Sequence, residues 1–65
     1  MSRELSEWVG EISVGEETFD IYEYYDSSTF KTLWYDVFDD VGNCINDGSP
    51  FYDMPTKEMI KLFLN

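Results

Sequence analysis

The chain has 65 residues, and its 14 Asp and Glu against four Lys and Arg give a formal net charge of −10, with no histidine. A chain this short buries only about 60% of the surface that its unfolded form exposes, so we expect one acidic domain over 1–65 with a single thin core. Hydrophobic residues make up 43% and aromatic residues 18%, which excludes a chain kept disordered by its charge. The charge argues against direct contact with nucleic acid or anionic membranes and favours basic surfaces.

The single cysteine, Cys44, excludes an intrachain disulfide and a multi-cysteine metal site. No neighbouring base in the sequence would activate its thiol, so we expect a small packed residue. The start of the chain lacks the basic residues and apolar run of a signal peptide, and no apolar stretch approaches the ~20 residues that span a bilayer. These features predict a soluble protein of the cytoplasm.

The N-terminal third contains the first predicted strand. Residues 1–7 are polar, and we expect a frayed arm or a short helical turn there. From Trp8 onward, Trp8, Ile12 and Val14 alternate with polar residues, which is the pattern of a strand. Gly10 interrupts the alternation and is a candidate β-bulge.

Two further strands are predicted over 18–25 and 31–38, after turns at 15–17 and 26–29. One face of these two strands is expected to carry Phe19, Ile21, Glu23, Tyr25, Leu33, Tyr35 and Val37. The opposite face is expected to carry Asp20, Tyr22, Tyr24, Trp34, Asp36 and Phe38.

The last third predicts a short fourth strand and a helix. A tight connection at 39–43 leads into a strand over 44–46. A helix follows over 55–64, with Thr56 as its cap and Glu58 in the first turn, where a negative charge is favourable. Its apolar stripe consists of Met59, Ile60 and Phe63, widened by Leu62 or Leu64.

This order of elements predicts an α+β fold. We expect an antiparallel meander of three to four strands over 8–47, followed by one C-terminal amphipathic helix packed on one sheet face. A single short helix cannot cover both faces of a sheet. The face with Tyr22, Tyr24 and Trp34 is therefore expected to stay partly exposed.

Composition also argues against an enzyme. Acid–base catalysis needs a proton carrier near neutral pH, and without histidine this would have to be a carboxyl group with a pKa raised by burial in a cleft. No nucleophile stands in a pattern with an activating base, and no glycine-rich phosphate loop occurs. We expect no catalytic residue and no cofactor.

Calcium is the one metal for which the residue pattern offers candidate ligands. Oxygen-bearing side chains are dense after the third predicted strand, at Asp36, Asp39, Asp40, Asn43 and Asp47. The EF-hand template fails, because aligning its glycine with Gly42 places Val37 and Val41 at ligand positions and Gly48 where the bidentate Glu belongs. Turn chemistry explains these residues better, so no metal site is expected.

The acids and aromatic residues together suggest a binding surface. Residues 11–53 hold eleven acids and one base, Lys31, so the predicted sheet region carries the whole net charge. Acids on one face of a strand recur about every 6.8 Å and could enter a groove built for phosphates, while Tyr and Trp add large rigid contacts. The candidate partner-binding residues are Glu16, Glu17, Asp20, Tyr22, Tyr24, Asp26, Trp34, Asp36, Asp39 and Asp40.

In size, in the charge gathered between Glu11 and Asp53, and in its interleaved aromatic residues, the chain resembles small acidic inhibitors encoded by bacteriophages. These are the anti-CRISPR and anti-restriction proteins that mimic nucleic acid. The aromatic residues that support the resemblance are Tyr22, Tyr24, Tyr25, Trp34, Tyr35 and Phe38. The resemblance implies a non-enzymatic, stoichiometric inhibitor in the host cytoplasm that occupies a basic DNA- or RNA-binding groove of a host defence protein.

Two other interpretations remain open at the level of sequence. The acids can form a plain solvated surface, with the aromatic residues used in packing. Alternatively, the chain is an ordinary interaction or scaffold domain, as a monomer or as a homodimer that buries its aromatic sheet face.

Overall fold

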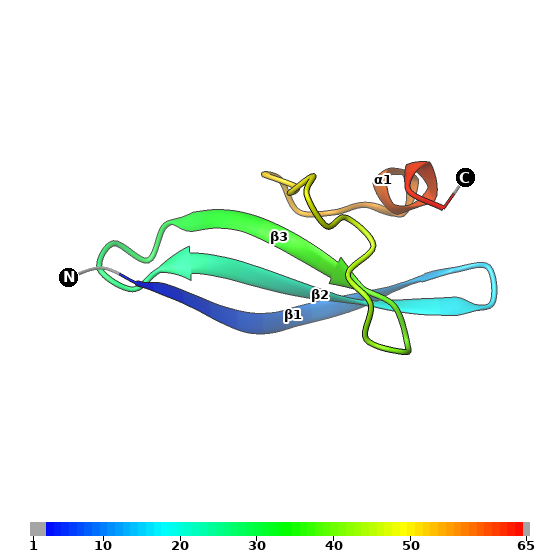
Figure 1. Cartoon of the computed structure of the whole chain (residues 1–65), viewed down its shortest axis with the longest axis horizontal. Coiled ribbons are helices and arrows are strands. Elements are labelled where there is room, and N and C mark those ends of the chain that lie inside the picture. The colour runs from blue at the N-terminus through cyan, green and yellow to red at the C-terminus, as the bar shows by residue number, and fades with distance from the viewer. Residues whose placement is uncertain (1–2, 65) are drawn as a thin grey trace.

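The computed structural model describes residues 3–64 and consists of a three-stranded antiparallel sheet and one short helix (Figure 1). The elements are β1 (Glu4–Val14), β2 (Glu17–Asp26), β3 (Thr32–Phe38) and α1 (Lys57–Leu62). The strands lie in the order β1-β2-β3, so the sheet is a meander, and the molecule is elongated, with extents of 41 × 17 × 16 Å. The predicted α+β class is confirmed, with three strands.

A two-residue loop joins β1 to β2. Val14 pairs with Glu17, and Gly15 and Glu16 connect them. Gly15 has a φ of 64°, and glycine at the first central position of a two-residue loop is typical of the turns whose twist matches the flanking strands. The predicted turn at residues 15–17 is therefore confirmed for its first two residues, while Glu17 belongs to β2.

A β-bulge next to Gly10 reverses the side-chain alternation of β1. Trp8 lies opposite Tyr22, but Gly10 already lies opposite Ile21, so β1 contains one extra residue. Because side chains alternate along a strand, one inserted residue moves all later side chains to the other face. The prediction that placed Trp8 on one face with Ile12 is therefore wrong, whereas the bulge itself is confirmed.

Residues 4–7 belong to β1, which corrects the frayed arm or helical turn expected over residues 1–7. Leu5 lies opposite Tyr25, and the Ser27 backbone N–H donates to the Arg3 carbonyl at 2.9 Å. Pairing with the end of β2 gives the backbone groups of this segment hydrogen-bond partners. The side chains of the segment do not form a pattern that predicts this pairing. Residues 1 and 2 lie outside the described residues.

The outer edge of β3 is covered by an irregular segment instead of a fourth strand. One isolated bridge pairs Cys44 with Phe38, and the chain then turns over residues 45–48. A second isolated bridge pairs Phe51 with Tyr35, whose backbone N–H donates to the Phe51 carbonyl at 2.7 Å. The strand expected over 44–46 does not form. After one bridge, the turn-forming residues Asn46, Asp47 and Gly48 direct the chain away from β3.

The buried side chain of Asn46 takes the place of a peptide group on that edge. Its Oδ1 accepts a hydrogen bond from the Val37 backbone N–H at 3.0 Å, and its Nδ2 donates to the Tyr35 carbonyl at 3.2 Å. Nδ2 also lies 3.4 Å from the Ser49 carbonyl. Only 1% of Asn46 is exposed; its bond to the Val37 N–H is buried and the other two are partly buried, and together they hold the segment against β3.

The core lies between α1 and one face of the sheet, called here the covered face. Its fully buried side chains are Phe19, Ile21, Val37 and Ile60. They come from β2, β3 and α1, and partly buried residues of β1 pack around them. The predicted packing of the helix on one sheet face is thus carried by a single fully buried helix residue, Ile60.

α1 has the predicted N-cap residue but is shorter than expected at both ends. The Thr56 Oγ1 accepts a hydrogen bond from the Met59 backbone N–H at 3.2 Å, and Glu58 lies in the first turn, which confirms the predicted cap. The helix covers Lys57–Leu62 instead of 55–64, and Leu62 is exposed. With six residues, this helix is too short to cross a membrane, and the described part of the chain has no other helix.

Asn46→Ala should lower the free energy of unfolding by about 1–3 kcal/mol, because it leaves the buried Val37 N–H without a partner and removes one of the two hydrogen bonds to the Tyr35 carbonyl. Urea denaturation followed by tryptophan fluorescence measures this change. Asn43→Ala is the matched control, since Asn43 is exposed and its amide lies 3.5 Å from Asp39; it should change stability by only about 0.5 kcal/mol. Equal effects of the two substitutions would contradict the role assigned to Asn46.

Candidate functional site on the outer face of the sheet

The sheet face that points away from α1, called here the outer face, is not covered by the helix (Figure 1). The pairing register decides which residues it carries, because side chains alternate between the two faces. They are Glu4, Ser6, Trp8, Glu11 and Ser13 from β1, Thr18, Asp20, Tyr22, Tyr24 and Asp26 from β2, and Trp34, Asp36 and Phe38 from β3.

Two aromatic pairs join β2 to β3 at the centre of this face. Tyr24 and Trp34 lie opposite each other and stack, with ring centroids 5.1 Å apart and ring planes 15° apart. Tyr22 and Phe38 meet edge to face, with centroids 5.5 Å apart and planes at 85°. Both geometries are favourable for aromatic rings, so the four side chains are held in place before any partner binds.

Trp8 adds a fifth ring from β1. Its Nε1 donates a hydrogen bond to Asp20 Oδ1 at 3.1 Å, and 54% of its surface is exposed. The bulge at Gly10 is what brings Trp8 to this face. A large, half-exposed ring held at one edge by a carboxylate is well placed for contact with another molecule.

Carboxylates face one another across β1 and β2. The directly opposed acidic pairs are Glu4 with Asp26, Glu7 with Glu23, and Glu11 with Asp20. By alternation the first and third pairs lie on the outer face, the first at one end of it and the third level with the end of β3, and the second pair lies on the covered face. Like charges directly opposite each other destabilise a sheet, by about 0.2–1 kcal/mol per pair, so a cation bound between them would stabilise the fold.

Asp36 lies among the aromatic rings and is half-buried. Burial raises the pKa of its carboxyl group above 3.8, a hydrogen bond with the Trp34 side chain lowers the pKa, and the nearby charge of Asp47 raises it. Burial, followed by the charge of Asp36, also raises the pKa of the Tyr24 phenol above 10. Tyr24 therefore presents a neutral hydroxyl group at physiological pH.

A groove of about 370 Å³ lies where the outer face meets the loop after β3. Its lining residues are Ser6, Asp20, Tyr22, Tyr24, Phe38, Asp39, Asp40 and Gly42. Asp39 holds the loop, because its Oδ1 accepts from the Val41 backbone N–H at 3.1 Å and from the Asn43 backbone N–H at 2.8 Å. Asp40 is exposed and leaves its carboxylate available to a ligand.

The structure places all the predicted binding residues except Glu16 and Glu17 on the outer face or on the loop that borders it. Those two lie at the β1–β2 loop, and Glu17 pairs with Val14 on the side of the covered face. Asp26 lies at the opposite end of the outer face, where its Oδ1 accepts from the Ser28 backbone N–H at 2.8 Å and so fixes the turn. The central residues of the predicted set are thus the aromatic ones and Asp20 and Asp36.

Sequence reasoning missed Trp8, Phe38, Ser6 and Gly42 as members of the site. A prediction that took the bulge at Gly10 into account would have placed Trp8 on the outer face, because one extra residue reverses the alternation. Phe38 was expected on this face but was not counted as a binding residue. Nothing in the local sequence marks Ser6 or Gly42, since the register and the fold of the loop bring them to the groove.

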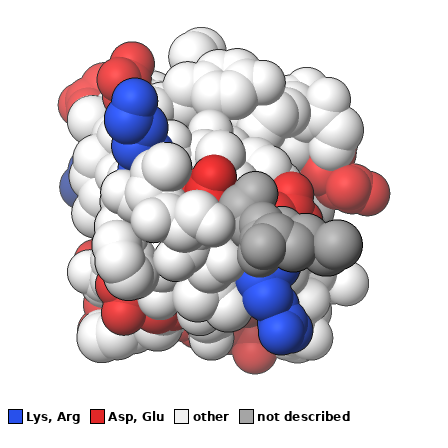
Figure 2. Space-filling model, turned by 90° about the vertical axis from the view of Figure 1, so that its left-hand side faces the viewer, with Lys and Arg blue, Asp and Glu red and all other residues white. Residues whose placement is uncertain are grey.

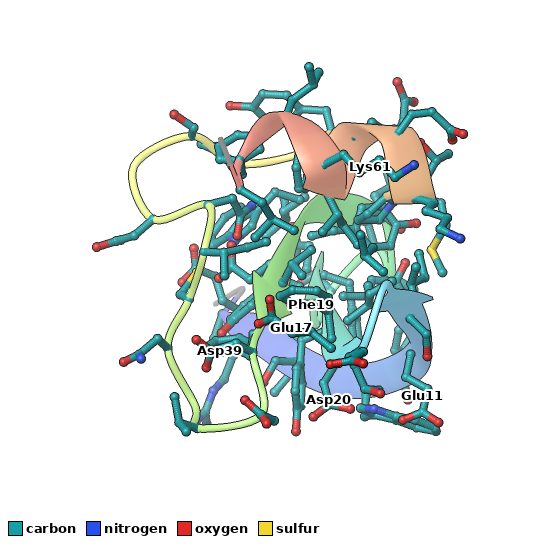
Figure 3. The ribbon with its side chains drawn as sticks, turned by 90° about the vertical axis from the view of Figure 1, so that its right-hand side faces the viewer. Glu11, Glu17, Phe19, Asp20, Asp39 and Lys61 are labelled. Atoms are coloured by element: carbon teal, nitrogen blue, oxygen red, sulfur yellow. The ribbon has the colours of Figure 1, made fainter. Side chains whose placement is uncertain are left out.

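The four bases of the chain lie away from the centre of this face. Arg3 precedes β1, Lys31 precedes β3, and Lys57 and Lys61 belong to α1. Figure 2 looks onto the end of the molecule at which β1 begins and shows basic and acidic side chains together there. Figure 3 looks from the other end and shows Glu11 and Asp20 on the side of the sheet opposite α1, which carries Lys61.

The cysteine and the acidic side chains are the groups of the described residues that could carry chemistry. Burial raises the pKa of the Cys44 thiol, so it stays protonated at neutral pH and is a poor nucleophile. Within residues 3–64, no three or more of the Asp, Glu and Cys side chains converge as metal ligands would. The Asp39 carboxylate, one of the potential calcium ligands, is instead bound to its own loop.

Comparisons with protein-family models, with curated proteins and with solved structures find no match to this chain. Its function is therefore inferred from the geometry and charge of the outer face.

Asp36→Asn should raise the melting temperature at pH 7. A carboxyl group whose pKa is higher in the folded than in the unfolded state loses stabilisation as pH rises through the folded pKa, so the amide variant gains at neutral pH. The difference between variant and native protein should shrink as pH falls towards 3.8.

Thermal melts at several pH values measure this effect, with Asp40→Asn as the control for simple charge removal from an exposed position. A gap between Asp36→Asn and native protein that is the same at every pH would contradict the assigned cause.

Proposed function

We propose that this chain is a non-enzymatic, stoichiometric inhibitor that occupies a basic nucleic-acid-binding groove of a host defence protein. A CRISPR–Cas effector or a restriction enzyme is the kind of target that fits, in the host cytoplasm. The observation that carries the proposal is the outer face, where fixed aromatic rings lie between paired carboxylates and the helix contributes its bases to the other side.

The charge density supports a nucleic-acid mimic. A net charge of −10 over a length of 41 Å is about one negative charge per 4 Å, and the residues outside the described range carry no charged side chain. One strand of a DNA duplex carries one charge per about 3.4 Å of helix axis. A basic groove that attracts a nucleic-acid strand would therefore also attract this molecule.

The aromatic residues at the centre of the outer face would supply contact area, which charge alone does not. Carboxylate pairs would steer the encounter, while the rings would add buried contact area once the two surfaces meet. Because Tyr24 with Trp34 and Tyr22 with Phe38 already pack as pairs, binding would cost little side-chain entropy. The arrangement matches an interface with an aromatic centre and a charged rim.

The opposed carboxylates give a third reason. They reduce the stability of the free protein, and a basic partner would remove that repulsion. Binding to the folded state would then raise the apparent stability of the domain. The same surface that weakens the free fold would favour the complex.

Capture from a bacterial lysate tests the proposal. Tagged protein is incubated with lysate of a strain that carries CRISPR–Cas and restriction systems, and the captured proteins are released at constant ionic strength with competing DNA or RNA. We expect nucleic-acid-binding proteins of these systems among those released, with capture that falls steeply as salt rises. A partner that resists both nucleic acid and high salt would contradict the mimic.

Two matched triple variants show whether the outer face makes the contact. Glu4→Lys/Glu11→Lys/Asp40→Lys changes exposed acids of the outer face and its bordering loop, and Glu16→Lys/Asp53→Lys/Glu58→Lys changes exposed acids elsewhere. Each reversal changes the charge by two units, so both variants carry −4 instead of −10. The first should lose capture at least tenfold more than the second, as expected if close contacts and not net charge decide binding.

Light scattering separates the proposal from the homodimer alternative. The inhibitor should be a monomer at low salt, where the carboxylates of two copies repel each other with little screening. A dimer that is insensitive to salt and is disrupted by Trp34→Ala would instead support self-association through the aromatic face.

A further inference from the structure

The groove beside the loop after β3 combines aromatic walls with carboxylates. Tyr22 and Phe38 meet at 85°, so a ring face and a ring edge form one corner. Asp20 lies on the same side of the sheet, and its Oδ1 is occupied by the Trp8 hydrogen bond, which leaves Oδ2 as an acceptor. Asp40 contributes a second, exposed carboxylate from the loop.

We infer that this groove is a receptor for an arginine side chain that projects from a partner protein. A guanidinium group is planar, so it can stack on an aromatic face while its N–H groups donate to carboxylates at its edge. The groove offers both kinds of contact within one hollow of about 370 Å³. The inference rests on the proposed function, because a basic nucleic-acid-binding groove is a surface rich in arginine and lysine.

Lysine fits this groove less well than arginine. Its ammonium group is compact and strongly hydrated and cannot form a two-bond fork with a carboxylate. Diffuse attraction to an acidic surface would treat the two cations alike, since it depends on charge alone. A preference for arginine is therefore the signature that separates a built receptor from a merely acidic surface.

Hydrogen bonds in the loop and the pairing of β2 with β3 give the groove a fixed shape. Asp39 holds the loop through its hydrogen bonds to the backbone of Val41 and Asn43, so the position of Asp40 is set by a closed turn. The cross-strand register holds Tyr22 next to Asp20 on β2 and opposite Asp36 on β3. The groove residues that would contact an arginine are thus already ordered, so binding would cost them little conformational entropy.

Titration of the isotope-labelled full chain with capped hexa-arginine and hexa-lysine peptides tests the inference. We expect the arginine peptide to bind about threefold to tenfold more tightly, as a guanidinium stacked on a ring should. The largest amide shifts should fall in residues 20–24 and 38–42. Equal affinities for the two peptides, or shifts spread over all acidic segments, would overturn the inference.

Matched variants locate the effect. Asp20→Asn/Asp40→Asn removes two of the three groove carboxylates, leaves Asp39 to hold the loop and keeps an oxygen for the Trp8 hydrogen bond. Asp53→Asn/Glu58→Gln removes two exposed charges outside the groove. The first should abolish the preference for arginine and the second should preserve it. Tyr22→Leu should also abolish the preference, and its amide spectrum reports whether the sheet is intact. Equal effects of the two double variants would refute the groove as the binding site.

The peptide experiment and the lysate experiment fail independently. Loss of arginine preference with persistent capture of nucleic-acid-binding proteins would refute the receptor and leave the inhibitor. A clear arginine preference without any such capture would refute the inhibitor and leave a receptor for another arginine-bearing protein.

Discussion

The buried carboxamide of Asn46 is the interaction on which the rest of the structure depends. By bonding to the Val37 N–H and the Tyr35 carbonyl, it closes the edge of β3 without a fourth strand. The segment held in this way carries the chain back over the covered face, where Phe51 packs and Ile60 is buried. A side chain can do this because its amide has the same donor and acceptor as a peptide group.

The irregular segment closes the edge of β3 and α1 packs on the covered face, so neither of them covers the outer face. Within residues 3–64, the apolar core has only four fully buried side chains, which come from β2, β3 and α1. On the outer face, aromatic pairs supply packing and opposed carboxylates work against it. Two of the three opposed acidic pairs therefore lie on the same face as the aromatic pairs.

Much of this arrangement could be predicted from local patterns. The alternation along β2 and β3 placed Phe19 and Ile21 on the covered face and Tyr22 and Trp34 on the outer face, since period-2 patterns are strictly local. The patterns failed where pairing partners decide the structure. The face of Trp8 depends on a bulge whose effect extends along the whole strand.

The sequence by itself determined the charge, the class of fold, the cap of α1 and the faces of two strands, because these follow from composition and from neighbours within a few residues. Only the tertiary structure decided that residues 4–7 form a strand, that Asn46 replaces a fourth strand, and that Ser6, Asp20 and Asp40 meet in one groove. Each of these results depends on hydrogen bonds or contacts between residues far apart in the chain. The partner of such a group is chosen by the fold as a whole, and no local pattern encodes it.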